Sequence, residues 1–186
     1  MTIGLELTEE QTAIKHAIED ICSKYDDHYW LGVDNSGEFP QAFVDDIAAG
    51  GWLGVAMPES VGGAGLGLTE AALMMQTVAQ SGAGFSGASA IHLNVFGLMP
   101  IVKFGTPEQQ QAFLPPVISG EDKTCFAVTE PNSGLDTASL ETKAERTNSG
   151  YRITGRKIWT TNAQRANKML IIARTTPKDQ AKRPTD

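Results

Sequence analysis

The chain has 186 residues, of which 41% are hydrophobic and 20% charged, and its formal net charge at pH 7 is −7. These values are typical of a globular protein with a sizeable core and exclude a disordered chain. The negative charge argues against a nucleic-acid partner, which requires a basic face. The length allows one ordinary domain or two small ones.

Cysteine and histidine are sparse. The cysteines are Cys22 and Cys125, and the histidines are His16, His28 and His92. None has the spacing of a zinc site or a disulfide framework, and the Gly-x-Ser-x-Gly motif of hydrolases is absent from the sequence. We therefore expect two reduced, buried thiols, no metal site, and a satisfied His92 on an apolar helix.

The first seven residues lack the basic start and the apolar block of a signal peptide. Apolar stretches are expected to be shorter than the roughly 20 residues that span a bilayer. These observations predict a cytoplasmic protein without membrane insertion.

Hydrophobic periodicity predicts helices over the first two thirds of the chain. Apolar residues recur there at three- and four-residue steps. Thr8 and Gln11 have the spacing of a capping box, and so do Thr106 and Gln109. The expected helices cover 8–30, Pro40 to Gly50-Gly51, a largely buried stretch capped by Thr69, 88–104, and a stretch that opens at Thr106 and ends before Pro115-Pro116.

The pattern changes near residue 123, where short strands are expected. The expected strands cover 124–129, 139–147, 151–154 and 168–174, the third half-buried and the last buried. Asn148-Ser149-Gly150 is a hairpin signal. Helices followed by strands predict an α+β protein. We assign an N-terminal all-α helical domain to 1–120 and part of an antiparallel β domain to 121–186.

A glycine-rich loop at 62–67 lacks the spacing and the preceding strand of a nucleotide-binding loop. We expect it to be a tight connection that packs against the next helix. The small residues at 81–90 leave room for close packing or for a ligand.

The most informative segment runs from Phe126 to Asn162. A strand enters the turn Thr129-Glu130-Pro131, and a second segment supplies Trp159 with Thr160 and Thr161. Exposed amides, hydroxyls and an indole suit a flat, hydrogen-bonding ligand. From the residues alone, a surface turn beside a core tryptophan is the favoured explanation.

Four ordered blocks give the chain a resemblance to the acyl-CoA dehydrogenase family along nearly its whole length. The blocks are Pro58-Glu59 with Gly62–Thr69, Phe104–Gln109, Val128–Pro131 with Gly134 and Asp136, and Gly155–Asn162. The resemblance implies a helical domain and the first half of a middle β domain, with the C-terminal four-helix domain missing. On this interpretation the chain is a piece of a longer protein.

The resemblance implies FAD as cofactor, bound between the middle and C-terminal domains. Phe126, Val128 and Thr129 would contact the flavin ring, with the Thr129 hydroxyl and main-chain groups at its pyrimidine edge. Trp159 would lie beside the ring, and Thr161 would hydrogen-bond near flavin N5. Fixed donors around the ring would stabilise the negative charge of the reduced flavin.

The implied reaction is α,β-dehydrogenation of an acyl-CoA thioester, in which a glutamate removes a proton and a hydride passes to flavin N5. The usual glutamate matches no position here, so we place no catalytic residue in this chain, and we assign Glu130 to the turn. The implied setting is fatty-acid β-oxidation, with an electron-transfer flavoprotein as acceptor and a homotetramer as the common assembly.

Leu135 stands where many family members have a serine that helps to hold phosphate or the CoA portion, and leucine cannot donate a hydrogen bond. Ser133 or a main-chain amide would have to replace it as a substrate contact. Three alternatives of function remain open: a nitroalkane oxidase, a monooxygenase or an acyl-carrier-protein dehydrogenase of the same fold. A non-catalytic binding subunit is the fourth.

Overall fold

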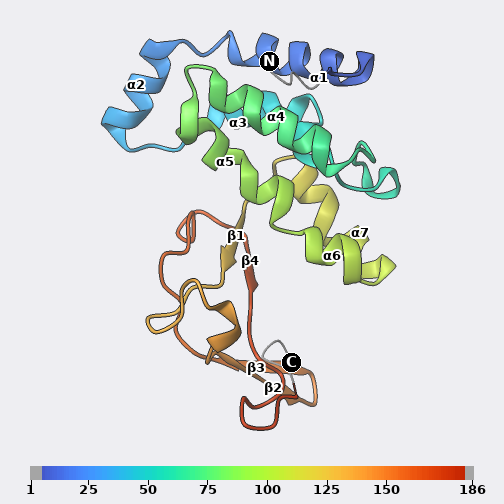
Figure 1. Ribbon diagram of the computed structural model, residues 1–186, viewed down its shortest axis with the longest axis vertical. Coiled ribbons are helices and arrows are strands. Elements are labelled where there is room, and N and C mark those ends of the chain that lie inside the picture. Colours follow the sequence, from blue (N-terminus) through green and yellow to red (C-terminus); the bar gives the residue numbers. More distant parts are fainter. Residues whose placement is uncertain (1–5, 183–186) are drawn as a thin grey trace. The chain divides into compact units, whose positions relative to one another are not determined.

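The computed structural model describes residues 6–182, and the chain separates into two compact units, Met1–Lys123 and Thr124–Asp186 (Figure 1). The first unit is built of helices and the second of short strands, which confirms the predicted order of a helical region followed by a small β region. The sequence features noted at 1–5 and 183–186 lie outside the described residues.

The helical unit contains seven α-helices and two 3-10 turns among the described residues (Figure 1). Their bounds are α1 Glu9–Cys22, α2 Asp27–Ser36, α3 Gln41–Ala49, η1 Trp52–Gly54, η2 Glu59–Val61, α4 Leu68–Gln80, α5 Gly84–Phe96, α6 Met99–Phe104 and α7 Pro107–Ile118. The capping boxes at Thr8–Gln11 and Thr106–Gln109 are both formed, as predicted. Pro40 is the residue before α3 rather than its first helical residue.

The single helix predicted over 8–30 is wrong, because the chain breaks after Cys22 and starts again at Asp27. The Asp26 side chain accepts a hydrogen bond from the Tyr29 amide at 2.9 Å and caps α2. The Tyr25 hydroxyl donates to the Ala42 carbonyl at 2.7 Å, so the connection is tied to α3. A new cap and an anchored tyrosine thus override the continuous periodicity.

The predicted cap at Thr69 is also wrong, since Thr69 lies inside α4 and Gly67 is the cap. The Glu70 carboxylate accepts a hydrogen bond from the Gly67 amide at 3.0 Å, and it also accepts one from the Gln11 side chain at 2.9 Å. Glu70 therefore starts α4 and links it to α1. Only one face of α4 is buried, around Met74 and Val78, rather than most of its circumference.

The helix predicted over 88–104 begins earlier, at Gly84, and is interrupted between α5 and α6. Within residues 6–182, the stretch Gly84–Phe104 is long and apolar enough to cross a membrane by length and composition, with a mean hydropathy of 1.4. The expectation of shorter apolar stretches is therefore wrong. Core helices have the same composition, and Ile91 and Val95 are fully buried in the helical unit. The absence of membrane insertion stays a prediction.

The helix α7 runs through Pro115 and Pro116 and ends at Ile118, so the predicted stop before them is wrong. Each proline removes a backbone donor from the helix. Leu114 and Val117 on either side are fully buried, and the Ser119 amide closes the last turn on the Pro115 carbonyl at 3.0 Å. Burial of this face outweighs the local preference of proline.

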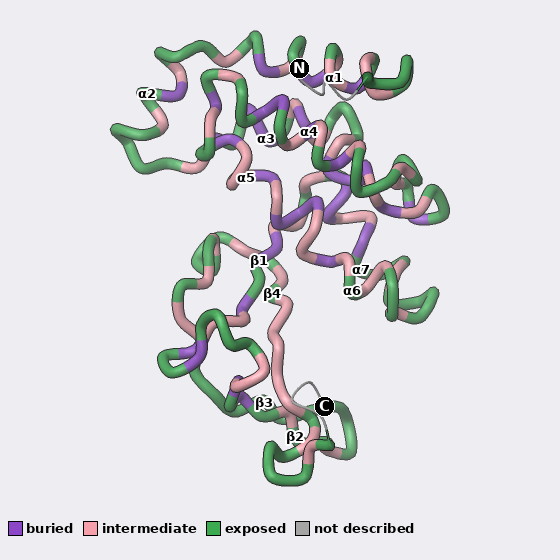
Figure 2. The backbone as a smooth tube through the Cα atoms, in the orientation of Figure 1, coloured by how far each residue is buried: buried purple, intermediate pink, exposed green. Residues whose placement is uncertain are grey.

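Many residues of the helical unit are buried, as the purple stretches of its backbone show (Figure 2), and their side chains form two core clusters. The larger one contains an aromatic group in which Trp30 and Phe43 contact edge to face at 5.1 Å between ring centroids. The smaller one joins Met57 to Leu114 and Val117. These clusters hold the helices, so the unit does not depend on helix propensity alone.

The glycine-rich loop packs closely on the segment before it, as expected from the sequence. The amides of Ala64 and Gly65 donate to the carbonyls of Gly54 and Met57 at 3.0 and 2.8 Å. A Cβ at Gly63 would approach the Met57 carbonyl oxygen to 2.2 Å, so only glycine fits. These amides are used within the chain and are not available to cradle a phosphate.

The β unit contains two separate pairs of strands among its described residues. Strands β2, Lys143–Thr147, and β3, Gly150–Thr154, form the predicted antiparallel hairpin, in which Thr147 pairs with Gly150. Strand β1, Thr124–Ala127, pairs with β4, Lys168–Ile171. This second pair is parallel, which the expectation of an antiparallel domain did not foresee.

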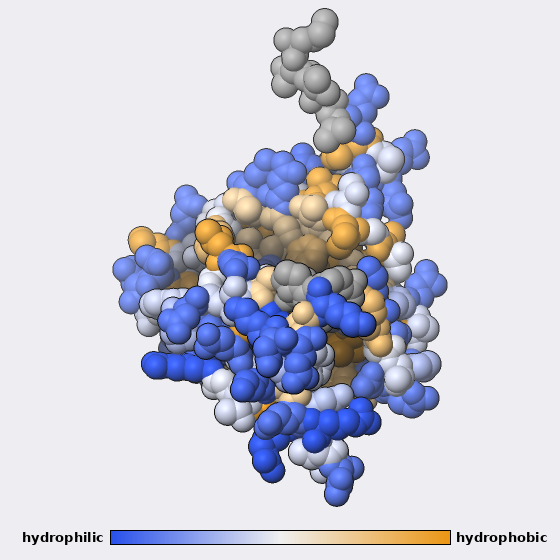
Figure 3. Space-filling view, turned by 60° about the horizontal axis from the view of Figure 1, so that its bottom comes forward, coloured by the Kyte–Doolittle hydropathy of each residue, from blue (hydrophilic) through white to orange (hydrophobic). Residues whose placement is uncertain are grey.

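The strands of the β unit are more exposed than expected. Every residue of β3 is exposed, with Tyr151 at 54% and Ile153 at 48%, and Met169 in β4 is 45% exposed. The half-buried positions predicted for β3 and the buried ones predicted for β4 are therefore wrong. Hydrophobic side chains are visible at the surface among hydrophilic ones (Figure 3).

Candidate functional site

A single backbone hydrogen bond brings together the two segments that the sequence selected. The Ile158 amide donates to the Thr129 carbonyl at 3.0 Å. Thr129 follows β1 by two residues, and Trp159 follows Ile158 directly. Segments 27 or more residues apart in the chain therefore lie side by side, with Thr129 next to the start of the Trp159–Thr161 stretch.

The strand β1 presents alternate side chains to two different environments. Cys125 and Ala127 are 1% and 0% exposed, whereas Phe126 is 37% exposed and Val128 is half-buried. Alternation along a strand puts Phe126 and Val128 on the same face. That face is the open one, and it holds two of the three β1-segment residues that were selected from the sequence.

The Thr129 amide and hydroxyl have no hydrogen-bond partner within residues 6–182. Both are donors, and a half-buried donor without a partner favours a ligand or water in that place. The Thr129 carbonyl is occupied by Ile158. Thr129 thus offers two free donors while its own carbonyl fixes the neighbouring segment.

Trp159 is held in an unusual backbone conformation with its indole exposed. Its φ angle is 57°, and its exposed fraction is 86%. A left-handed φ angle is costly for residues other than glycine, above all for bulky ones, and such strain is common at binding sites. The core tryptophan that was an alternative from sequence does not exist here. Thr161 is exposed as well, two residues further along.

Beneath these segments, the Glu130 carboxylate is buried, with 6% of the residue exposed, and it accepts hydrogen bonds from four donors. The amides of Glu141 and Thr142 donate at 2.7 and 2.9 Å, the Lys157 ammonium donates at 2.9 Å, and the Thr142 hydroxyl is the fourth donor. Glu130 therefore binds its own turn to the residues before β2 and to the segment before Trp159. Because Glu141 and Thr142 serve this carboxylate, β2 begins at Lys143 instead of residue 139.

The electrostatics of this cluster exclude Glu130 as a base. Burial raises the pKa of Glu130. The hydrogen bonds from the Thr142 hydroxyl, the Glu141 amide and the Lys157 ammonium together lower it by more than burial raises it, and the pKa is about 2. A carboxylate that stays ionised at such low pH and has its oxygens occupied does not take up a proton from a substrate. Its role is to shape the site.

Sequence reasoning left Lys157 and Thr142 out of the site, although both contact Glu130. One signal could have found them. Glu130 and Lys157 each stand next to apolar residues in short runs, Val128-Thr129 and Ile158-Trp159. Charged residues in such positions are seldom buried without a partner, so a Glu–Lys pair was the natural inference.

The two predicted substrate contacts behave differently. The Ser133 side chain is 5% exposed and its hydroxyl donates to the Asp136 carbonyl at 2.6 Å, so that hydroxyl is not free to donate to a phosphate. The replacement of the family serine by Ser133 as a substrate contact stays a prediction. Leu135 is fully exposed at 105% and contributes no donor. A contact between Leu135 and CoA stays a prediction.

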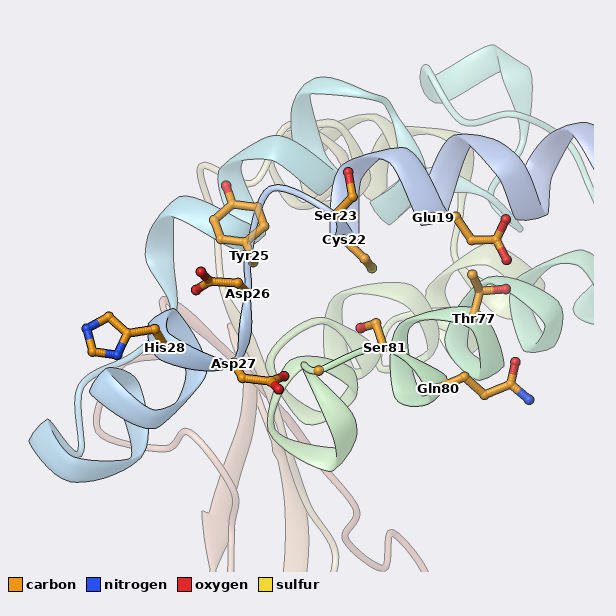
Figure 4. Close-up of a pocket in the computed structure, with 11 residues that line it drawn as sticks. Glu19, Cys22, Ser23, Tyr25, Asp26, Asp27, His28, Thr77, Gln80 and Ser81 are labelled. Atoms are coloured by element: carbon orange, nitrogen blue, oxygen red, sulfur yellow. The ribbon is translucent and has the colours of Figure 1, made fainter.

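A cavity away from these segments lies in the helical unit, where α1 ends and α4 joins α5 (Figure 4). It has a volume of about 530 Å³, and its lining includes Glu19, Cys22, Asp27 and Ser81. Burial raises the pKa of the Cys22 thiol, so this thiol is a poor nucleophile. Within residues 6–182 no group of three or more His, Cys, Asp or Glu side chains could hold a metal ion.

Comparison with known proteins agrees with this geometry. The chain matches the N-terminal domain of acyl-CoA dehydrogenases over residues 8–121 and their middle domain over residues 125–185. It is 35% identical to a probable acyl-CoA dehydrogenase, YngJ, of Bacillus subtilis over 175 residues, which is 93% of this chain and 45% of that protein. The chain thus spans about half the length of the relatives that it matches.

Solved structures share the fold. The acyl-CoA dehydrogenase of Geobacillus kaustophilus is 28% identical with a TM-score of 0.81, and the match covers 96% of this chain and 46% of that one. The FAD complex of PigA has a TM-score of 0.86 at 23% identity, covering 94% of this chain and 46% of that one, which shows the fold alone.

A helical unit followed by a small β unit is the architecture that the chain shares with the acyl-CoA dehydrogenase of Geobacillus kaustophilus. The chain belongs to the acyl-CoA dehydrogenase family, of which it carries the N-terminal domain and the first part of the middle domain.

Proposed function

We propose that this chain forms the middle-domain side of an FAD site, and that the whole protein catalyses α,β-dehydrogenation of acyl-CoA thioesters. When bound, FAD supplies the acceptor for a hydride. The family membership and the free donors of Thr129 support the proposal. The β unit fits the group, because a flat ring needs an open apolar face with donors at one edge, and Phe126, Val128 and Thr129 offer this arrangement.

Each residue of the site has a separate task in this proposal. Phe126 and Val128 form the apolar wall, and the Thr129 amide and hydroxyl donate to the pyrimidine edge. The Trp159 indole covers the ring and excludes water, and the Thr161 hydroxyl donates near N5. Fixed donors of this kind cost no reorganisation when negative charge develops.

The rest of the reaction is assigned to parts of the protein that this chain does not contain. No position here matches the usual catalytic glutamate, and Glu130 is occupied by its four donors. We propose a base outside this chain, an acyl-CoA substrate in fatty-acid β-oxidation, an electron-transfer flavoprotein as acceptor, a homotetramer and a cytoplasmic location.

The observation that carries the proposal is the free Thr129 amide and hydroxyl, on a segment that is hydrogen-bonded to the one carrying the exposed Trp159 indole. Titration of the chain with FAD, followed by flavin fluorescence and by amide shifts of the β unit, tests it. We expect a dissociation constant weaker than micromolar, because only one side of the site is present, and shifts at Thr129 and Trp159. Trp159→Ala should abolish them, whereas Tyr151→Ala, an exposed aromatic in the hairpin, should not.

The chemistry needs a second experiment. Anaerobic addition of acyl-CoA to an FAD-loaded preparation of the whole protein should bleach the flavin. If the flavin stays oxidised with acyl-CoA but reacts with a nitroalkane or an acyl-carrier-protein thioester, the proposed reaction is wrong. The proposed FAD site would be unaffected by that result. A whole protein that is purified colourless and takes up no FAD would contradict the site itself.

A further inference from the structure

The Lys157 ammonium makes two contacts at the base of the candidate flavin site. It donates to the Glu130 carboxylate at 2.9 Å and to the Val128 carbonyl at 2.8 Å. The contact with the Val128 carbonyl is the unusual one, because the ion pair between Lys157 and Glu130 can form without it. Side-chain exposure is 11% for Lys157 and 6% for Glu130, so both contacts are shielded from water.

The Val128 carbonyl and the Thr129 amide belong to one peptide unit. No cis peptide bond occurs in the described part of the chain, so the carbonyl and the N–H of this unit point in opposite directions. Lys157 therefore lies on the carbonyl side, and the Thr129 N–H projects away from it. This N–H is the donor that has no partner among residues 6–182.

A positive charge on a peptide carbonyl strengthens the N–H of the same unit as a donor. Hydrogen bonds in chains polarise one another, and the effect is larger where water is excluded. A contact with an ammonium is also stronger than one between neutral groups. The Lys157 charge, which contacts the Val128 carbonyl, therefore makes the Thr129 amide on the opposite side of the same peptide a stronger hydrogen-bond donor.

We propose that Lys157 is a positioning residue that polarises the Val128–Thr129 peptide, so that the Thr129 amide binds reduced FAD in preference to oxidised FAD. This inference rests on the proposed FAD site. The charge of Glu130 opposes the effect, because a carboxylate next to the ammonium partly neutralises it. Glu130 and Lys157 together set the strength of one donor.

Two variants separate this role from a merely structural one. Lys157→Met removes the charge with a side chain of similar length, and it should move the Thr129 amide proton upfield. Glu130→Gln leaves the ammonium uncompensated, and it should move the same proton downfield. A loosened site would instead move both signals the same way, toward the value of an unfolded chain.

The measurement is an amide proton–nitrogen spectrum of the 186-residue chain without flavin. Lys143→Met, an exposed lysine on the hairpin, is the matched control and should leave Thr129 unchanged. Contacts between β2 and β3 in each variant establish that the unit is folded. If Glu130→Gln proves too disruptive, Lys157→Arg takes its place. This variant retains the charge, so its Thr129 amide proton should return most of the way from the Lys157→Met position to the wild-type position. Shifts of equal sign, or no shift in Lys157→Met, overturn the proposal.

Titrations with oxidised FAD and with chemically reduced FAD complete the test. Lys157→Met should lower the ratio of reduced to oxidised affinity by about two- to fivefold, whereas lost packing would weaken both alike. Equal weakening of the two affinities overturns the preference. A wild-type chain in which FAD leaves the Thr129 amide unchanged overturns the proposed FAD site, while the amide shifts of the variants still decide the polarisation.

Discussion

Gly155 lies directly against Thr142, whose hydroxyl donates to the Glu130 carboxylate. A Cβ at position 155 would approach the Thr142 Oγ1 atom to 2.2 Å. The two segments can meet at this distance only because residue 155 has no side chain. The glycine at this position therefore has a structural reason, namely the close approach that lets Lys157 reach Glu130.

Gly155→Ala should destabilise the β unit by about 1–3 kcal/mol, because the added methyl group forces Thr142 away from Glu130. Hydrogen exchange of the β2–β3 amides measures this loss without interference from the helical unit. Gly134→Ala is the matched control, since a Cβ there meets nothing within 4 Å. Equal protection in the two variants would contradict the close approach.

The buried Glu130 predicts an acid-sensitive β unit. The pKa of Glu130 is about 2 in the folded chain, against an ordinary value of 4.5, so the ionised carboxylate stabilises the fold above about pH 4.5. This contribution, roughly 3 kcal/mol, is lost as the pH falls from about 4.5 to about 2. A carbon-detected titration should find Glu130 still ionised at pH 3, and Glu130→Gln should flatten the pH dependence of hairpin protection. A Glu130 that titrates near 4.5 would show that the four donors do not bind it.

The sequence predicted those parts of the fold that local chemistry decides. The capping boxes at Thr8 and Thr106 and the hairpin turn before Gly150 depend on residues within a few positions of each other. The break after Cys22 and the passage of α7 through Pro115-Pro116 depend on contacts with distant helices, to which periodicity is blind. The parallel pairing of β1 with β4 is of the same kind.

The candidate site likewise has some residues that sequence motifs identify and others that only three-dimensional contacts reveal. Thr129 and Trp159 were recognised through their motifs, and the structure places their segments side by side. Their roles toward FAD stay predictions. The Lys157 contact with the Val128 carbonyl could not be read from the sequence, because it joins positions 29 residues apart through side-chain geometry.

Asn94 predicts a polar link inside the helical unit. Its buried side chain donates to the carbonyls of Asp122 and Val117 at 3.0 and 3.4 Å, joining α5 to the end of α7. Asn94→Ala should cost about 1–3 kcal/mol, because the buried Val117 carbonyl and the half-buried Asp122 carbonyl lose a donor. Chemical denaturation followed by helical circular dichroism measures the change, and the exposed Asn35→Ala should change little. Identical denaturation midpoints for the two variants would show that the Asn94 hydrogen bonds do not stabilise the helical unit.

Tyr25 should ionise only at strongly alkaline pH. Burial raises its pKa to about 12, with further contributions from its contact with Asp46 and from the charges of Asp46 and Asp45. Because its pKa is higher in the folded chain, the protonated hydroxyl stabilises the helical unit below about pH 10, and this stabilisation is lost as the pH rises toward 12. The alkaline absorbance change of tyrosinate should include a late step near pH 12, and Tyr25→Phe should remove that step. A late step that persists in Tyr25→Phe would assign the raised pKa to another tyrosine and would leave the bond to the Ala42 carbonyl without its expected effect.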